Sequence, residues 1–155
     1  MLPHEVPRGP LLTLTKPDLP VLMAYCLDTN IIVFCLRGKS AKAANRLRMT
    51  PASDVRVPMQ VLAELRVGAA KSAKPSENKA ATESFVKPFT LIWPDEAVVE
   101  HYVAIRTVLE SIGQSISEAD LWIAATARAM GDVMVTNNVR EFQRVPGLAV
   151  EDWSA

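Results

Sequence analysis

The 155-residue sequence has few cysteines, few histidines and few aromatic side chains. Its two cysteines are Cys26 and Cys35, and its two histidines are His4 and His101. Two cysteines cannot form a disulfide framework, and no Cys/His cluster with zinc-ligand spacing surrounds them. His4 lies in a proline-rich segment and His101 in an amphipathic helical pattern, so acid–base catalysis by histidine is disfavoured. We therefore expect a reducing, cytoplasmic environment and chemistry carried by other side chains.

The sequence also has no excess of charge and no long apolar run. Its 17 Lys and Arg residues balance its 17 Asp and Glu residues. A strongly basic chain would attract nucleic acid through its overall charge, so any such contact here must come from local patches. No apolar run approaches the roughly 18 residues that cross a bilayer, and the N-terminus lacks the hydrophobic region of a signal peptide. We expect no association with a membrane.

Composition and length together predict one globular domain after a short extension. Hydrophobic residues make up 49% of the chain and aromatic residues 6%, which predicts an aliphatic, alanine-rich core. A core of the size that this length allows needs no disulfide or structural metal to be stable. Residues 1–22 contain five of the eleven prolines and show no steady periodicity. We expect residues 1–22 to be a poorly ordered extension and residues 23–155 to be the domain. Met23 is an alternative start that N-terminal sequencing would test.

Apolar segments with strand and helix periodicity alternate along the domain. This alternation predicts an α/β fold with a mostly parallel sheet of four to five strands sandwiched by helices. In the helix over 96–112, Val99, Val103, Leu109 and either Ile105 or Arg106 are expected near one face. The predicted strands cover 25–27, 55–57, 90–93, 133–136 and 148–150, and the predicted helices cover 31–36, 41–49, 59–74, 77–87, 96–112 and 117–130.

Two acidic residues stand near the expected ends of the first two strands. Asp28 follows the first strand, where ligands collect in open α/β sheets; alternatively it is an Asx turn or a helix N-cap. Glu64 lies on the helix over 59–74, where it is either a solvated helix residue or a site residue. Its positions four residues away hold Gln60 and Gly68 instead of a base, so no helical ion pair accounts for it.

Asp120, in "SISEADLWIAATARAMG", is the third candidate acid. One reading is a capping box with Ser117 as the N-cap. Against it, Asp120 shares a helical stripe with Ile123, Ala124 and Ala127, which should face the sheet. A carboxylate directed at a core costs several kcal/mol unless a cation or donors accompany it, and no Lys or Arg lies nearby on this stripe.

A fourth polar group, in "VTNNVREF", follows the strand over 133–136. It contains Thr136, Asn137, Asn138 and Glu141, which form either a turn leading into a helix or part of a site. Three or four acids at the exits of one parallel sheet would converge, and they could not all stay ionised without a neutralising charge. Oxygen ligands without His or Cys select a hard cation, Mg²⁺ or Mn²⁺.

Four blocks resemble the PIN-domain ribonucleases: "YCLDTNIIVFCLRG", "VLAELRVGA", "ISEADLWIAATARAMG" and "VMVTNNVREFQRVPGLAVEDW". The sequence resembles most the VapC toxins of type II toxin–antitoxin systems. The resemblance runs from about Met23 to Trp153, so it implies a PIN-like fold for residues 23–155. It also implies a Mg²⁺-dependent (or Mn²⁺-dependent) endoribonuclease that activates water for in-line attack and leaves a 5′-phosphate and a 3′-hydroxyl.

The resemblance also implies roles for individual residues. The first three acids of the family fall on Asp28, Glu64 and Asp120. The fourth is in doubt, because Asn138 stands where many PIN domains have Asp, and Glu141 is the alternative. Asp28 and Asp120 would hold the metal directly, and Glu64 and Glu141 through water. The matching supporting polar residues are Thr29, Asn30, Thr136 and Asn138.

The family also implies partners. Its toxins cleave structured RNA, with transfer RNA expected here, inhibit translation, are neutralised by a cognate antitoxin, and commonly form homodimers. The apolar helices over 31–36 and 61–70 are candidates for the protein contacts. For RNA contacts the candidates are Arg37, Lys39, Lys42, Arg46 and Arg48, followed by Arg66, Lys71 and Lys74. The alternative for these basic residues is an ordinary solvated helix face.

Two rival functions stay open from the sequence. A catalytically inactive PIN-like binding module is supported by the missing acid at Asn138. A haloacid dehalogenase-type phosphatase would use the same first acid, but it needs a second Asp two residues later, where Asn30 stands. Cleavage of RNA with Mg²⁺, and its loss in Asp28→Asn, would separate these readings.

Overall fold

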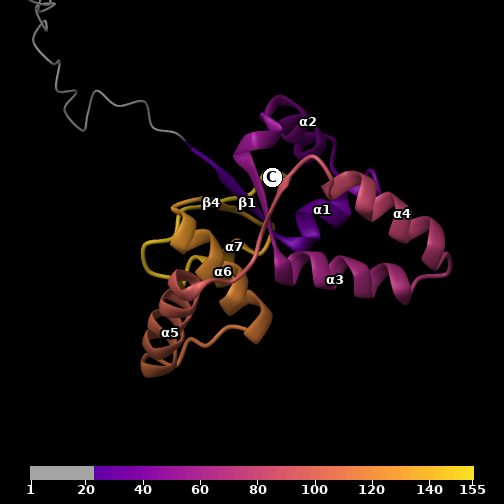
Figure 1. The fold of residues 1–155 in the computed structure, drawn as a ribbon. Coiled ribbons are helices and arrows are strands. Elements are labelled where there is room, and N and C mark those ends of the chain that lie inside the picture. Colours follow the sequence, from indigo (N-terminus) through magenta and orange to yellow (C-terminus); the bar gives the residue numbers. More distant parts are fainter. Residues whose placement is uncertain (1–22) are drawn as a thin grey trace, which may run out of the picture.

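The computed structural model describes residues 23–155 and shows an α/β fold around one parallel sheet (Figure 1). The strand order is β3-β2-β1-β4-β5, and all four neighbouring pairs are parallel. The predicted fold class is therefore confirmed, whereas the expectation for residues 1–22 lies outside the described residues. The strands are β1 (Tyr25–Leu27), β2 (Val55–Pro58), β3 (Thr90–Ile92), β4 (Val133–Val135) and β5 (Val150–Glu151).

Helices flank this sheet. In Figure 1, α5 and α6 lie together at the lower left of β1 and β4, whereas α1 to α4 lie to the right. In the same view, helices α3 and α4 run in opposite directions beside each other and extend furthest from the sheet. Within the described residues the α-helices are α1 (Thr29–Leu36), α2 (Ala41–Met49), α3 (Met59–Ala70), α4 (Pro75–Val86), α5 (Glu96–Ser111), α6 (Glu118–Met130) and α7 (Val139–Phe142).

The helices begin and end where capping chemistry predicts. The side chains of Ser40, Asp95 and Ser117 each accept a hydrogen bond from a backbone N–H in the first turn of α2, α5 and α6. Gly131 ends α6 with φ at +69°, a left-handed conformation in which a Cβ is disfavoured. This conformation allows the chain to turn from the end of α6 towards β4. Ser117, one residue before α6, fixes the start of the same helix.

The core is aliphatic and alanine-rich, as the composition predicts. Residues of the two central strands are fully buried, including Leu27 and Val135, and α6 contributes Ile123, Ala124 and Ala127. The small side chains on α6 allow the helix to lie close to the sheet. None of the helices in the described part of the chain is long and apolar enough to span a bilayer.

Several details of the elements differ from the prediction. The helix predicted over 59–74 ends at Ala70, and the strand predicted over 148–150 is Val150–Glu151. On α5, Ile105 and Leu109 are buried as expected, whereas Val99 and Val103 are 44% and 56% exposed, so that part of the expected apolar face was wrong. The buried face consists of Val98, Ile105 and Leu109, because α5 packs against α6 along those positions. The second strand includes its final proline, which pairs in register with Ile92. A proline is tolerated there because it is the last residue of the strand. A short helix, α7, follows β4, in agreement with the interpretation of "VTNNVREF" as a turn leading into a helix.

Candidate active site

Asp28 lies at the carboxyl end of β1, and the neighbouring strand β4 holds it in place. Leu27 pairs with Val135, so the two strands end side by side. The Thr136 hydroxyl, directly after β4, donates a 2.7 Å hydrogen bond to Asp28 Oδ2, and the Thr29 amide donates a 2.8 Å bond to Oδ1. The Asp28 side chain also caps α1. The N-cap interpretation of this residue is therefore confirmed.

The environment of Asp28 disfavours its ionised form. The residue is only 6% exposed. Burial raises the pKa of the Asp28 carboxyl, the bonds from Thr136 and Thr29 oppose this, and the charge of Glu64 raises the pKa further. A carboxylate with a second acid beside it needs a positive charge to stay ionised at low cost.

Glu64 reaches the same edge from α3. Its Oε2 accepts a 2.5 Å hydrogen bond from the Thr29 hydroxyl. Thr29 therefore contacts two of the predicted acids, Asp28 through its amide and Glu64 through its side chain. This is a connection between α1 and α3 that sequence spacing does not show, because the two residues are 35 positions apart.

Asp120 is half-buried in the first turn of α6. Its amide donates to Ser117 Oγ at 3.2 Å, so the capping interpretation is partly right. Its carboxyl is nevertheless part of the acidic cluster. Burial raises the pKa of Asp120 to about 6, and the charge of Asp28 and the carboxyl of Glu141 also raise it. Asp28 and Glu141 are therefore the two acids that disfavour ionisation of the Asp120 carboxyl.

Glu141 lies on α7, where Asn138 orients it. The Asn138 side-chain amide donates a 3.0 Å bond to Glu141 Oε2, and the Asn138 backbone amide donates a 2.9 Å bond to the Thr136 hydroxyl. Asn138 thus links the acid on α7 to the threonine that holds Asp28. Asn30 is exposed on α1, and no hydrogen bond of its side chain is seen among residues 23–155.

Two buried acceptors lie near these strand ends: Asn137 belongs to the polar group predicted after the fourth strand, whereas Gln60 was not a predicted site residue. Asn137 Oδ1, between Thr136 and Asn138, and Gln60 Oε1, in the first turn of α3, have no hydrogen-bond partner among the described residues. Asn137 follows β4, and Gln60 follows β2. Position after a strand is the sequence signal that the two residues share.

The donor set suits a hard cation, but the side chains are not gathered around one point. The four acids offer only carboxylate oxygens, the ligands that Mg²⁺ and Mn²⁺ prefer. However, no three Asp, Glu, His or Cys side chains in the described part of the chain are placed to hold one metal ion together. Glu64 is turned to Thr29 and Glu141 to Asn138.

The basic residues expected to bind RNA divide into two groups. Arg37 lines a groove between α1, α3 and α4 that also includes Glu64, Leu65 and Ala69. Lys42 and Arg46 instead contact the C-terminal segment of the chain. Lys42 Nζ donates to the Ala155 carbonyl at 3.2 Å.

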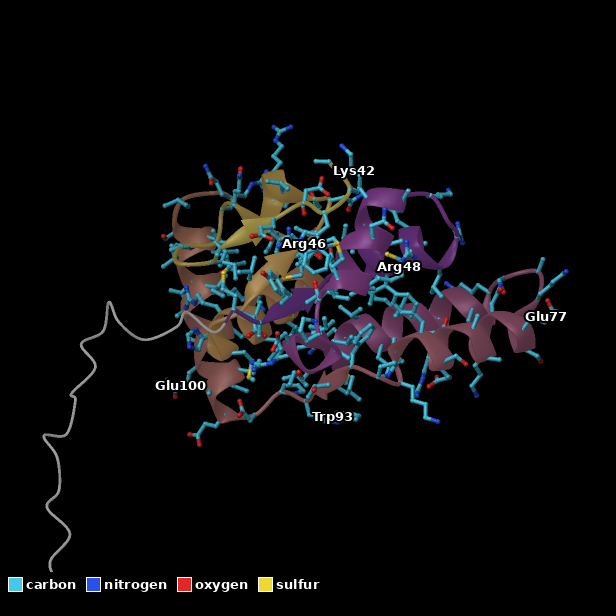
Figure 2. The ribbon with its side chains drawn as sticks, turned by 90° about the horizontal axis from the view of Figure 1, so that it is seen from above. Lys42, Arg46, Arg48, Glu77, Trp93 and Glu100 are labelled. Carbon is cyan, nitrogen blue, oxygen red and sulfur yellow. The ribbon has the colours of Figure 1, made fainter. Side chains whose placement is uncertain are left out.

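Arg46 is held by an aromatic pair. Its guanidinium lies 5.2 Å from the Trp153 ring centre and 5.8 Å from the Tyr25 ring centre, and 3.8 Å from Glu151. In the view of Figure 2, Lys42, Arg46 and Arg48 lie together on one side of the molecule. Among the basic residues predicted to bind RNA, Arg37 is therefore the one that lies in the same groove as a predicted acid, Glu64.

The PIN domain family matches residues 25–148 of this chain. The tRNA(fMet)-specific endonuclease VapC of Shigella flexneri is 38% identical over 133 residues, which are 86% of this chain and all of that protein. Ribonuclease VapC2 of Haemophilus influenzae is 35% identical over 132 residues, which are 85% of this chain and 99% of that protein.

Solved structures agree with these relatives. The structure of VapBC2 from Rickettsia felis bound to a DNA fragment from its promoter matches with a TM-score of 0.79 and 34% identity, over 84% of this chain and 99% of that chain. DNA-bound VapBC from Salmonella typhimurium matches with a TM-score of 0.80 and 34% identity, over 84% and 98%. By family match, sequence identity and fold, the chain belongs to the PIN-domain family and, within it, to the VapC ribonucleases.

Proposed function

We propose that this chain is a divalent-cation-dependent endoribonuclease toxin whose active site consists of Asp28, Glu64, Asp120 and Glu141. One observation carries the proposal. Hydrogen bonds through Thr29, Thr136 and Asn138 connect Asp28, Glu64 and Glu141 near the ends of β1 and β4. The charge of Asp28 and the carboxyl of Glu141 also raise the pKa of Asp120. A cluster of this kind has a physical reason to exist if it binds a cation and a phosphate.

Asp28 and Asp120 are the residues that would hold Mg²⁺ or Mn²⁺ directly, with Glu64 and Glu141 acting through water. When bound, such a cation supplies a Lewis acid that lowers the pKa of a water and stabilises charge on the phosphate. Glu64 would leave the Thr29 hydroxyl, or Glu141 would leave Asn138, to complete the set. Each turn would give up one hydrogen bond, to Thr29 or to Asn138, which contacts made with the bound cation would replace.

The neutral residues of the site orient the acids. The Thr136 hydroxyl accepts a hydrogen bond from the Asn138 amide and donates one to Asp28, so the hydroxyl proton points towards Asp28. Asp28 can then present its remaining lone pairs to the cation. Asn138 stands where many family members have an acid, and here it positions Glu141 as the fourth carboxylate.

The substrate that fits best is a structured RNA. Two of the relatives are named tRNA(fMet)-specific endonucleases, which supports transfer RNA as the substrate class of this chain. Because the formal net charge is zero, phosphates must be attracted locally. Arg37, in the same groove as Glu64, is the best placed of the predicted basic residues.

A cognate antitoxin is the protein partner that the solved VapBC complexes support. The groove between α1, α3 and α4 has an apolar floor of Val33, Leu36, Leu65 and Ala69 and reaches Glu64. An amphipathic segment of the antitoxin would fit this floor. The homodimer remains a prediction, which a strict monomer in size-exclusion chromatography at high concentration would contradict. The two free cysteines are in keeping with a reducing cytoplasm.

The experiment is incubation of the purified chain with total RNA and Mg²⁺. We expect discrete cleavage products, and their ends, mapped by sequencing, would identify the substrate. Asp28→Asn should reduce cleavage at least about 100-fold, because it removes a ligand charge at the centre of the site. Glu77→Gln, which changes an exposed acid on α4, is the matched control. RNA binding without cleavage would favour an inactive binding module, and hydrolysis of small phosphoesters alone would favour a phosphatase.

A further inference from the structure

Trp93 stands apart from the other two tryptophans because it is open to solvent. It is 64% exposed, directly after β3. Trp122 is stacked on Tyr102 with ring centres 4.0 Å apart, and Trp153 is 6% exposed and packs edge-on against Tyr25. Figure 2 shows Trp93 at the rim of the molecule, on the opposite side from Lys42, Arg46 and Arg48 in that view.

The position of Trp93 places it at the same edge of the sheet as the acids. Ile92, the last residue of β3, pairs with Pro58, the last residue of β2, which immediately precedes α3, the helix that carries Glu64. In the sheet, β3 is two places from β1, whose end carries Asp28. Neighbouring strands lie about 4.8 Å apart, so the ends of β3 and β1 are separated by about 10 Å. A short single strand of RNA spans such a distance.

The backbone on both sides of Trp93 is fixed. Ile92 belongs to the ladder with β2, and Pro94 restricts its own φ and the conformation of Trp93. Asp95 then caps α5, its Oδ1 accepting from the Val98 amide at 3.0 Å. A large aromatic ring is therefore presented to solvent from a rigid segment, so that little backbone entropy would be lost when a ligand packs on it.

We propose that Trp93 is a stacking platform for an unpaired base of the RNA, next to the acidic site. The proposal rests on the proposed ribonuclease function and names a subsite of it. Stacking on an indole tolerates any base and depends little on overall protein charge, which suits a chain without net charge. The ligand class is an unpaired nucleobase in a loop or single strand, held while the phosphate beside it meets the acids.

The test measures binding and not cleavage. The full-length Asp28→Asn variant serves as the parent chain, because it should bind the RNA without cleaving it. Its Kd for a fluorescein-labelled, unstructured eight-nucleotide RNA is measured by anisotropy. We expect added Trp93→Ala to weaken Kd roughly 5- to 100-fold, the range for loss of one base stack. Trp93→Phe should retain most of the affinity. Met49→Ala is the matched control, since Met49 is 83% exposed at the end of α2, just before β2 begins.

A series of variants of this RNA, each lacking the base at one position, separates base stacking on Trp93 from a loss of affinity that does not depend on any base. One abasic position should weaken binding of the parent chain as much as Trp93→Ala does, and it should cause no further loss in Trp93→Ala. A Kd within twofold of the parent, a loss that is independent of every base, or no binding by the parent chain would overturn the proposal. So would a loss of affinity that appears only because Trp93→Ala turns a dimer into a monomer. Failure of the ribonuclease function itself is seen separately, as no cleavage by the unsubstituted chain.

Discussion

Thr136 is the residue that fixes the geometry of the site most directly. It is fully buried, donates to Asp28 at 2.7 Å and accepts from the Asn138 amide at 2.9 Å. A hydroxyl with a bound donor and a bound acceptor cannot rotate freely. Thr136 thus connects the first acid to the segment that carries Glu141.

We expect Thr136→Val to lower RNA cleavage about 10- to 100-fold, because Asp28 loses the donor that orients it. The free energy of unfolding should fall by about 1–2 kcal/mol from the lost hydrogen bonds. Thr126→Val is the matched control: Thr126 is also fully buried, but its hydroxyl donates to the Trp122 carbonyl within α6. The control should lose similar stability and keep its activity. Equal activity of the two variants would contradict the role of Thr136.

Asp120 predicts how stability depends on pH in the absence of metal. Its pKa is raised from 3.8 to about 6, so between pH 4 and pH 6 the folded chain keeps a proton that the unfolded chain has released. The free energy of unfolding should therefore fall as pH rises from 4 to 6 and change little above that. Burial raises the pKa of Asp28 and Asp132 as well, which adds to the same trend.

Asp120→Asn should remove part of this fall and stabilise the metal-free chain at pH 7 by about 1–2 kcal/mol, after allowance for solvent screening of a half-exposed carboxyl. Urea unfolding in EDTA at pH 4, 5, 6 and 7 measures both effects. If the free energy of unfolding of Asp120→Asn fell with pH as steeply as that of the unsubstituted chain, titration of Asp120 would not be a cause of this pH dependence.

At the scale of the elements, alternating strand and helix patterns were enough to predict most of the fold. The strand over 25–27 and the helix over 41–49 have the predicted bounds, and the parallel arrangement follows from helices between strands. The bounds of α7 were not predicted, because four residues are too few to show helical periodicity. The apolar face of α5 was predicted correctly at Leu109 and Ile105 but not at Val99 and Val103, because the helix carries valines on both faces.

The site itself could not be derived from spacing alone. Asp28 and Thr136 are in contact although they are 108 positions apart, because β1 and β4 are neighbours in the sheet. Sequence patterns predict strands but not their order. The strand order, and with it the contact between these residues, comes from the structure. The links from Thr29 to Glu64 and from Asn138 to Glu141 depend on side-chain conformations that no pattern contains.

The sheet is also held together by an ion pair that crosses β1. Arg56 of β2 and Asp132, just before β4, lie on either side of β1, and Arg56 Nη1 is 3.0 Å from Asp132 Oδ1. The Asp132 side chain is 2% exposed, and its Oδ2 has no hydrogen-bond partner in the described structure. Removing the arginine would leave a buried negative charge without compensation.

We therefore expect Arg56→Met to lower the free energy of unfolding by about 3 kcal/mol, measured by urea denaturation. Arg66→Met is the contrast, because it breaks an exposed ion pair with Glu83 and should cost less than about 1 kcal/mol. The double variant Arg56→Met/Asp132→Leu should recover much of the loss. Similar losses in Arg56→Met and Arg66→Met would show that the pair across β1 has no special role.

At the scale of the whole molecule, opposite charges balance in number but are distributed unevenly. Hydrogen bonds through Thr29, Thr136 and Asn138 connect Asp28, Glu64 and Glu141 near the ends of β1 and β4. Lys42 and Arg46 instead join α2 to the C-terminal segment. Those two cations are occupied by contacts within the chain. RNA binding should therefore depend on few cations, chiefly Arg37.

Salt dependence tests this distribution. We expect Arg37→Ala to weaken RNA binding for all sequences and to reduce the slope of log Kd against log salt by about 1, the value for one phosphate contact. Arg46→Ala should chiefly lower thermal stability, because it removes the cation between Tyr25 and Trp153. Anisotropy titrations over a range of KCl concentrations provide the slopes. A larger change of slope in Arg46→Ala than in Arg37→Ala would reverse the assignment.

A Mn²⁺ titration followed by electron paramagnetic resonance tests the central claim that the four acids form one cation site. We expect saturable binding to the unsubstituted chain, at least about tenfold weaker binding in Asp28→Asn and in Asp120→Asn, and unchanged binding in Glu77→Gln. Equal Mn²⁺ affinity in all four proteins, or no saturable binding to any of them, would contradict the claim.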